Sequence, residues 1–280
     1  MTESNRQDRT VTARTAPPGP APLFCPATRP DRVRKAAEAA DAVIVDLEDA
    51  VAPDDKGIGR RHALEVLDTL GTGRVIVRVN AASTPWHTED LRALIDFPEA
   101  VVMLPMTASR DEVEMLRPRP VIALCETAAG ILAAPAIAQA ANCAGLMWGG
   151  EDLLADLGGR TGDGRGRLPV LDHARWTVLL AARAAGLPAI DTVYVDTDDE
   201  SGLSAEAVEA ANAGFDAKAC VHPKQVPAVR SAFRPTEGEI AWAGRVLSAA
   251  ASRGGAFGFE GGMVDAPVIA RARSILAVSG

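Results

Sequence analysis

The sequence predicts an α/β protein in which eight parallel strands close into a (β/α)₈ TIM barrel with a C-terminal helical extension. Eight short apolar runs alternate with stretches in which apolar residues recur at helical spacing. The runs are apolar on both faces, as buried parallel strands are. An open doubly wound sheet is the alternative, but no glycine-rich dinucleotide turn follows the first run, which weighs against it.

Each expected element has its own segment of the chain. The expected strands cover residues 22–27, 41–47, 74–80, 100–106, 120–126, 145–150, 191–196 and 217–223. The expected helices between them cover residues 29–40, 59–70, 111–117, 131–141, 171–186 and 204–214. Two more helical stretches, about 236–252 and 264–278, are joined by the glycine-rich GGAFGFEGG. The segment GGRTGDGRGRLP (158–169) is a candidate lid.

Three regions follow from this order. Residues 1–21 are polar and rich in threonine, arginine and proline, so we expect a disordered tail. Residues 22–234 form the expected catalytic barrel. Because a barrel closes without further helices, residues 235–280 are expected to cover a site as a lid or to contact a neighbouring subunit.

Composition restricts the classes of partner. The net charge of −8 makes nucleic acid and anionic membranes unsuited as main partners, although a local basic pocket for an anionic ligand is compatible with it. The four cysteines show no CxxC spacing, and no apolar run reaches the roughly 18 residues that span a bilayer. These features predict a protein of the cytoplasm.

Three carboxylates follow the second apolar run, in the segment VIVDLEDAV at residues 43–51. They are Asp46, Glu48 and Asp49. Like charges at the end of a buried strand repel each other and lose solvation, so a cation or a hydrogen-bonding network is expected to compensate them. The alternative is a helix N-terminus, where acidic residues favour the helix dipole.

Other polar residues stand at the carboxyl ends of the expected strands, where barrels carry their active residues. Arg78, Asn80, Glu126, Asp152 and His222 are in this position. Such oxygen ligands suit Mg²⁺, which takes one or two protein carboxylates and keeps several waters. We assign Glu126 and Asp152 as metal ligands, and Glu48 and Asp49 as catalytic candidates that hold metal-bound water. Asn80 is a candidate substrate-binding residue.

Several of these residues have structural alternatives. Glu126 and Asp152 each precede a helical stretch that they would cap. Arg78 lies in a buried strand and needs an anion, which is either a protein carboxylate or a substrate. His222 precedes a proline, where a histidine fixed by a turn is the commoner case. The four histidines show no zinc-ligand pair, and no GxSxG motif supports a serine hydrolase.

At these same residues the sequence resembles the citrate lyase beta-subunit-like group of the HpcH/HpaI aldolase superfamily, which includes malyl-CoA and citramalyl-CoA lyases. The similarity spans nearly everything after the tail. The matching blocks are LFCPATRPDRVRKA (23–36), DAVIVDLEDAV (41–51), VRVN (77–80), ETAAGI (126–131), GGEDLLADLG (149–158), AARAAGLPAIDTVYVDTDDESGL (181–203), CVHPKQ (220–225) and GGMVDAP (261–267).

The resemblance implies a Mg²⁺-dependent carbon-carbon lyase that joins or separates an acyl-CoA and a 2-oxo acid. It implies metal ligation by Glu126 and Asp152, and binding of the oxo acid or the enolate oxygen by Arg78. It also implies that Asp265 acts as acid or base in a neighbouring subunit's site, and that Arg29 and Lys35 bind the CoA nucleotide. A homotrimer or hexamer is implied as well.

One position departs from the family pattern. Met106 stands where many relatives have a lysine, so the identity of the anionic substrate is left open. Three alternative functions stay open with it: a CoA-independent 2-oxo acid aldolase, a malate synthase or thioesterase type of activity, and a non-catalytic acyl-CoA-binding homologue.

Overall fold

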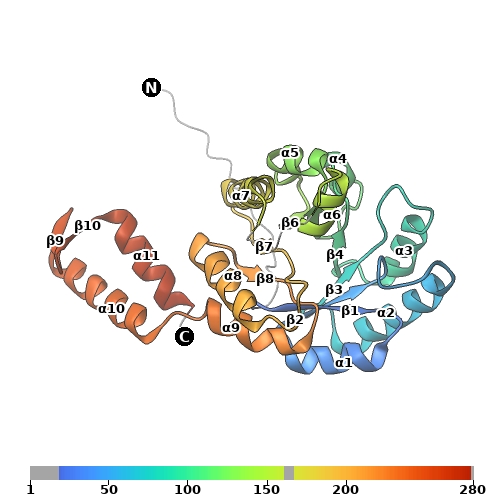
Figure 1. The fold of residues 1–280 in the computed structure, drawn as a ribbon, viewed down its shortest axis with the longest axis horizontal. Helices are drawn as coiled ribbons and strands as arrows, with labels where there is room; N and C mark the ends of the chain where they lie inside the picture. The colour runs from blue at the N-terminus through green and yellow to red at the C-terminus, as the bar shows by residue number, and fades with distance from the viewer. Residues whose placement is uncertain (1–18, 161–166, 279–280) are drawn as a thin grey trace. The chain divides into compact units, whose positions relative to one another are not determined.

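The barrel predicted from the sequence is present in the computed structural model, which describes residues 19–160 and 167–278 (Figure 1). Within this part, eight parallel strands pair in chain order, and a bridge between Leu23 and Cys220 joins the last strand region to the first. The strands are β1 (Pro22–Pro26), β2 (Ala42–Asp46), β3 (Val75–Arg78), β4 (Val101–Leu104), β5 (Val121–Cys125), β6 (Cys143–Trp148), β7 (Ala189–Asp191) and β8 (Ala217–Lys218).

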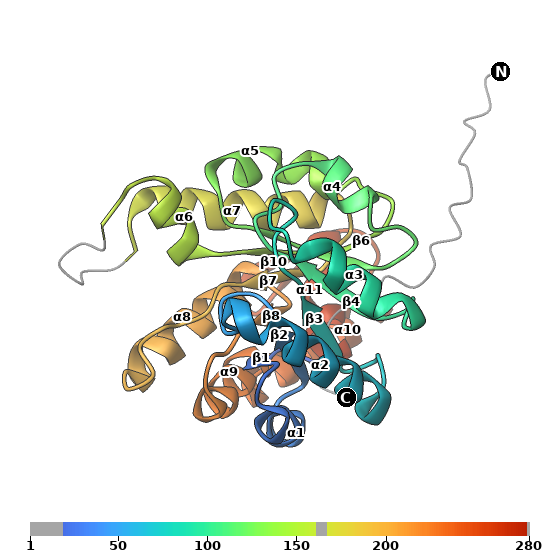
Figure 2. The same cartoon turned by 90° about the vertical axis from the view of Figure 1, so that its right-hand side faces the viewer.

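Helices follow the strands and surround them (Figure 2). The α-helices up to residue 233 are α1 (Pro30–Ala39), α2 (Lys56–Leu70), α3 (His87–Ala93), α4 (Arg110–Glu114), α5 (Ala128–Ile137), α6 (Gly150–Asp156), α7 (Pro169–Ala184), α8 (Glu200–Ala213) and α9 (Val226–Phe233). The 3₁₀ turns are η1 (Pro53–Asp55), η2 (Leu94–Asp96) and η3 (Pro223–Gln225). No helix of the described ranges is long and apolar enough to cross a membrane.

Alternate residues of the strands fill the barrel interior, because successive side chains of a strand point to opposite faces. The buried interior layers combine alanine with larger apolar residues (isoleucine, leucine and methionine), which fill a narrow barrel. They consist of Ala42, Ile44, Ile76, Met103, Ile122, Leu124, Met147, Ile190, Ala217 and Ala219.

Two differences from the expected strands affect the site. The β-branched alternation of residues 191–196 predicts a strand there, but β7 ends at Asp191 and the following residues form a loop. The expected strand at 217–223 is likewise shorter, because β8 ends at Lys218. Asp191 and Lys218 therefore stand at strand ends, and α3 forms where no helix was expected.

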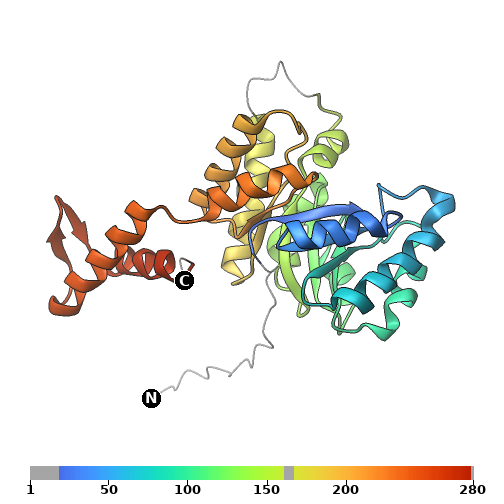
Figure 3. The same ribbon diagram turned by 90° about the horizontal axis from the view of Figure 1, so that it is seen from below.

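The C-terminal residues form a second compact unit, and the division between the units falls between Val229 and Arg230. It contains α10 (Glu237–Ser252), β9 (Phe257–Phe259), β10 (Gly262–Val264) and α11 (Ala266–Ala277) (Figure 3). The expected glycine-rich connection is thus a β-hairpin. Glu260 and Gly261 have φ values of +48° and +81°, as the two central residues of a type I′ turn require. The buried core of the C-terminal unit consists of Ala243, Val246, Val264 and Ala272.

Parts of two expected segments lie outside the described residues. These are residues 1–18 of the expected N-terminal tail and residues 161–166 of the candidate lid.

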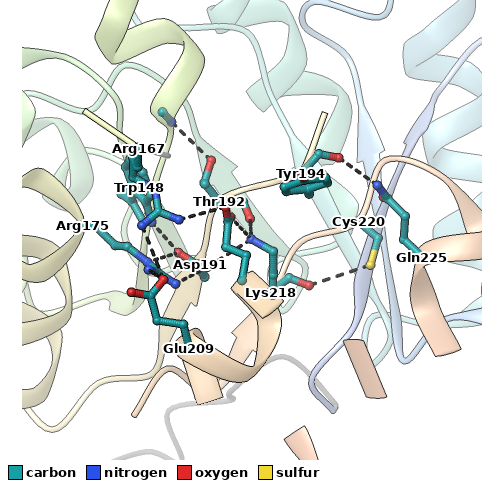
Figure 4. Close-up of polar contacts among 12 residues, drawn as sticks. Trp148, Arg167, Arg175, Asp191, Thr192, Tyr194, Glu209, Lys218, Cys220 and Gln225 are labelled. Atoms are coloured by element: carbon teal, nitrogen blue, oxygen red, sulfur yellow. Dashed lines mark hydrogen bonds and ion pairs between the residues drawn. The ribbon is translucent and has the colours of Figure 1, made fainter. Parts of the chain in front are cut away.

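A buried charge network joins β6, β7 and β8 to the helices outside them (Figure 4). Asp191 is fully buried and accepts hydrogen bonds from Trp148 Nε1 (2.7 Å), Arg175 Nε (2.9 Å) and Lys218 Nζ (3.1 Å). Arg175 is also fully buried and pairs with Glu209 of α8 at 2.5 Å. Each charge of this network therefore has a partner of opposite sign between the sheet and the helices.

We expect Asp191→Asn to lower the free energy of unfolding by about 3–5 kcal/mol, because it leaves buried Arg175 and Lys218 short of one negative charge. Urea denaturation followed by circular dichroism measures the change. Asp68→Asn, on an exposed part of α2, is the matched control and should change little. Equal midpoints for the two variants would contradict the prediction.

Candidate active site

Charged side chains continue the interior layers at the carboxyl ends of the strands. Asp46 follows Ala42 and Ile44 at two-residue spacing on β2. By the same alternation, Arg78 follows Ile76 on β3, and Glu126 follows Ile122 and Leu124 beyond β5. The sequence therefore brings a guanidinium and two carboxylates to one end of the barrel interior.

A two-pronged ion pair joins Asp46 to Arg78. Their Cα atoms are direct partners in the pairing of β2 with β3, and Arg78 Nε and Nη2 donate to the two Asp46 oxygens at 2.8 and 2.7 Å. The same oxygens accept the backbone N–H groups of Glu48 (2.8 Å) and Ala50 (3.1 Å). The Arg78 guanidinium also lies 5.0 Å from the centre of the Phe24 ring. The anion that pairs with Arg78 is therefore a protein carboxylate, which is one of the two alternatives that the sequence left open.

Glu48 and Asp49 meet the same guanidinium from the loop after β2. Glu48 Oε2 lies 3.1 Å from Arg78 Nη1, and Asp49 Oδ2 lies 3.2 Å from Nη2. Glu48 is largely buried, whereas the Asp49 side chain is 69% exposed. Burial raises the pKa of Glu48 to about 8, although Arg78 opposes the shift, and the charges of Asp49, Asp46 and Asp152 add to it. One guanidinium does not offset so many acids.

Glu126 is buried without a cation among its partners in the described structure. Its Oε1 accepts the backbone N–H of Met106 at 2.9 Å. Met106 holds this N–H in a left-handed conformation with φ of +52°, which is unfavourable for a residue other than glycine. The pKa of Glu126 is raised from 4.5 to about 8, mainly by burial. The charges of Asp152 and Glu48 contribute to this shift, whereas the Met106 N–H and the charge of Arg78 oppose it.

Asp152 lies in the first turn of α6, close enough for its charge to act on both Glu48 and Glu126. It is not the N-cap of this helix, because that position is Gly149. Glu126 does not cap α5 either, because Thr127 accepts the Gly130 N–H there. The capping alternatives for both acids are therefore absent from the structure.

The carboxylate set has the composition of a hard-cation site. Among residues 19–160 and 167–278, no three His, Cys, Asp or Glu side chains are arranged as a complete protein ligand set. Mg²⁺ needs no such set, because it keeps several waters and takes one or two carboxylates. Glu126 and Asp152 offer two acids in a region of excess negative charge.

Asn80 lies in a buried network that sequence reasoning did not find. Its Oδ1 accepts from Lys56 Nζ at 2.6 Å, and its Nδ2 donates to the Leu47 carbonyl (3.0 Å) and to Asp90 Oδ2 (2.6 Å). Lys56 Nζ also donates to the carbonyls of Leu47 and Glu48, both at 2.7 Å. Asn80 and Lys56 thus fix the loop that carries Glu48. No sequence pattern marks Lys56, because it stands at the start of an ordinary amphipathic helix.

Lys218 and Asp191 were also missed, and the sequence does contain a signal for them. A lysine within an apolar run needs a buried anion for the same reason as Arg78 does. Asp191 satisfies the strand-end rule once β7 is ended at its observed position.

Four other candidate residues make local contacts of their own or are exposed. Arg29 is exposed before α1 and lies 3.4 Å from Asp31, and Lys35 is exposed within α1. His222 accepts the Lys224 N–H at 3.2 Å and so caps η3, as a turn residue does. Asp265 belongs to the C-terminal unit, where its Oδ1 accepts the Val268 N–H at the start of α11.

The raised pKa of Glu126 predicts a pH-dependent stability in the metal-free protein. Between its unfolded pKa of 4.5 and its folded pKa of about 8, the folded chain binds more protons, so stability falls as pH rises through this window. Glu126→Gln removes this titration. We expect the slope of unfolding free energy against pH to become shallower by up to about 1.4 kcal/mol per pH unit.

Urea denaturation in EDTA-containing buffers from about pH 5 to about pH 8 measures this slope. Glu151→Gln, at an exposed neighbouring position in α6, is the matched control and should retain the original slope. A slope unchanged by Glu126→Gln would show that Glu126 does not titrate in this window.

Comparison with known proteins agrees with the architecture. The family model described as HpcH/HpaI aldolase/citrate lyase matches residues 21–223. A citrate lyase subunit beta-like protein of Mycobacterium tuberculosis is 50% identical over 266 residues, which cover 94% of this chain and 96% of that protein. A (3S)-malyl-CoA thioesterase of Cereibacter sphaeroides is 36% identical over 234 residues, covering 81% of each.

Solved structures show the same relationship. A crystal structure of protein CitE from M. tuberculosis in complex with magnesium, acetoacetate and coenzyme A has a TM-score of 0.87 at 49% identity, and covers 95% of this chain and 99% of that one. A citrate lyase beta subunit from M. tuberculosis, complexed with oxaloacetate and magnesium, has a TM-score of 0.75 at 48% identity, with 79% and 99% covered. This chain therefore belongs to the HpcH/HpaI aldolase/citrate lyase family.

Proposed function

We propose that this protein is a Mg²⁺-dependent carbon-carbon lyase that cleaves or forms a 3-hydroxyacyl-CoA from an acyl-CoA and a 2-oxo acid. The observation that carries the proposal is the pair of acids Glu126 and Asp152, which lies at the end of the barrel interior together with Glu48 and Arg78. Similar proteins crystallised with magnesium together with oxaloacetate, or with acetoacetate and coenzyme A, support it.

The residues present fit a divalent cation. Glu126 has a backbone N–H as its hydrogen-bond donor, is buried, and faces the negative charges of Asp152 and Glu48, so a cation would stabilise its ionised form. A 2-oxo acid is itself an anion and would be repelled by this group of carboxylates without such a cation. Glu126 and Asp152 are the proposed ligands.

When bound, Mg²⁺ supplies a Lewis acid for the carbonyl of the oxo-acid half. In the cleavage direction, a base accepts the proton of the substrate hydroxyl, the carbon-carbon bond breaks, and the thioester oxygen receives the electrons as an enolate. Arg78 is the proposed donor to the oxo acid or to this oxygen, because its orientation is fixed by Asp46 before substrate binds. Glu48 and Asp49 are the proposed residues that would hold metal-bound water.

Proton transfer to the acyl product and binding of CoA are assigned to other residues. We assign to Asp265 of a neighbouring subunit the transfer of a proton to the acyl carbon of the enolate, which completes the acyl-CoA product. Arg29 and Lys35, which are both exposed, are the proposed contacts for the CoA phosphates. A homotrimer or hexamer would bring Asp265 to the site. We place the enzyme in the cytoplasm.

We expect Glu126→Gln and Asp152→Asn to weaken Mg²⁺ binding at least about tenfold, because each removes one anionic ligand, and to remove most turnover. The assay is a panel of malyl-CoA, citramalyl-CoA and citryl-CoA incubated with protein and Mg²⁺, with products identified by mass spectrometry and Mg²⁺ affinity measured by calorimetry. The control is Glu151→Gln in the same helix as Asp152.

Full turnover in either variant would remove the metal assignment. The lyase proposal would be overturned if the unsubstituted protein neither cleaved any of these thioesters nor formed one from an acyl-CoA and a 2-oxo acid. Turnover of the corresponding free hydroxy oxo acids would favour a CoA-independent aldolase, whereas thioester binding without turnover would leave an acyl-CoA-binding protein.

Asp265→Asn is expected to lower turnover about 100-fold or more while leaving Mg²⁺ affinity within experimental error, because the residue moves a proton and holds no ion. Calorimetry and steady-state kinetics on the same preparation separate these effects. Because Asp265 also caps α11, circular dichroism must show retained helix. A variant that loses Mg²⁺ binding would place Asp265 in the wrong role.

A second candidate activity has a specific observation in its favour. The (3S)-malyl-CoA thioesterase of C. sphaeroides is 36% identical to this chain. A thioesterase would release free CoA and a hydroxy acid, whereas a lyase leaves the thioester intact on the acyl product. Quantifying free CoA with a thiol reagent in the panel assay distinguishes the two.

A further inference from the structure

The junction between β6 and α6 is held at both ends by side chains from the end of β7. Trp148, the last residue of β6, donates its indole N–H to Asp191 Oδ1 at 2.7 Å. Gly150, the first residue of α6, donates its backbone N–H to Thr192 Oγ1 at 3.2 Å. Figure 4 shows Trp148, Asp191 and Thr192 converging at this junction. Asp152 follows it by two residues.

The junction passes directly against Glu126. A Cβ atom on Gly149 would lie 2.6 Å from Glu126 Oε2, and one on Gly150 would lie 3.2 Å from the Trp148 ring. Gly149 is also tied to β5, because its N–H donates to the Cys125 carbonyl at 3.3 Å. The backbone of this junction therefore has little room on the Glu126 side, and its placement decides how Asp152 lies relative to Glu126.

Thr192 replaces a missing helix cap. The first N–H groups of a helix have no partner within the helix, and the N-cap residue of α6 is Gly149, which has no side chain to accept from them. The Thr192 hydroxyl accepts one of these N–H groups from a different strand end. It is a tertiary contact that fixes a helix of seven residues, which is too short to be stable alone.

Thr192 is itself held in place by the charge network. Lys218 Nζ donates both to the Thr192 carbonyl (2.9 Å) and to Asp191 Oδ2 (3.1 Å). Arg175 grips both Asp191 oxygens, at 2.9 and 3.0 Å. Thr192 is 8% exposed, so its side chain has little access to solvent. Lys218 and Asp191 thus hold Thr192 in the position from which it contacts the start of α6.

We propose that Thr192 is a positioning residue that sets Asp152 against Glu126 through the Gly150 N–H. The inference rests on the proposed function in assigning these two acids to one cation. It predicts that the hydroxyl of Thr192, which touches neither acid, controls the affinity of the pair for Mg²⁺. The charge network between the sheet and α7 and α8 then acts on the start of α6 through this contact, in addition to the hydrogen bond that Trp148 donates to Asp191.

The test compares Thr192→Val, which keeps the shape of the side chain and removes the acceptor, with Thr192→Ser, which keeps the hydroxyl. In the metal-free full-length protein, the valine variant should show faster hydrogen exchange at the Gly150 amide. Its dissociation constant for Mg²⁺, measured by calorimetry without substrate, should rise roughly tenfold. The serine variant should restore both values to near those of the unsubstituted protein.

Thr69→Val is the matched control, because the Thr69 hydroxyl donates to the Glu65 carbonyl on α2, away from this junction. It should change neither the exchange rate nor the dissociation constant. Since a merely structural role would lower the melting temperature without changing Mg²⁺ affinity, a Thr192→Val protein with unchanged affinity would overturn the inference. Serine that fails to rescue would overturn it as well.

These results separate the inference from the proposed function. If the unsubstituted protein and Glu126→Gln bind Mg²⁺ equally, the metal assignment in the proposed function fails. The Gly150 exchange rate in the metal-free protein then still decides whether Thr192 holds α6, and an unchanged rate in Thr192→Val refutes that contact.

Discussion

The ion pair between Asp46 and Arg78 is the interaction on which the rest of the candidate site depends. It joins two neighbouring strands at positions that are direct partners in the sheet, so the register of β2 and β3 creates it. Asp46 also binds two backbone N–H groups of the following loop, which turns the chain so that Glu48 and Asp49 face Arg78. A single carboxylate therefore compensates a buried guanidinium and shapes the loop beside it. Lys56 secures that loop from the other side through its carbonyls.

Two buried carboxylates of this protein, Asp191 and Glu126, lie in different electrostatic environments. Burial alone would raise the pKa of Asp191, but Lys218 and Arg175 together lower it, so this acid is ionised and permanently paired. Glu126 is also buried, and burial together with the charges of Asp152 and Glu48 raises its pKa to about 8, although the Met106 N–H and the charge of Arg78 oppose the shift. The first environment stabilises the contact between sheet and helices. The second is unfavourable for an ionised acid unless a cation binds, which is the arrangement expected of a functional group.

Much of the barrel follows from local pattern. The apolar runs predict β1 to β6 closely because a buried strand needs uninterrupted apolar residues, and that requirement is visible in sequence. The pattern fails at β7, where the alternating DTVYVD resembles a strand but forms a loop whose Tyr194 carbonyl accepts from Gln225 Nε2 at 2.8 Å. That error moved Asp191 from the end of a strand to its beginning, and the charge network was missed with it. The hairpin at Glu260 and Gly261 was missed because its strands have three residues each.

The sequence by itself determined which acids and which arginine reach the end of the barrel, because strand order and side-chain alternation place Asp46, Arg78 and Glu126 on one interior face. Only the tertiary structure decided the partners of these groups. Arg78 binds Asp46, and Asn80 binds Lys56 and Asp90, whereas the hydrogen bond that Glu126 accepts within the described residues comes from the Met106 backbone N–H. The physical reason is that electrostatic compensation depends on distance and burial, and residues 10 to 32 positions apart in the chain acquire both only when the barrel closes.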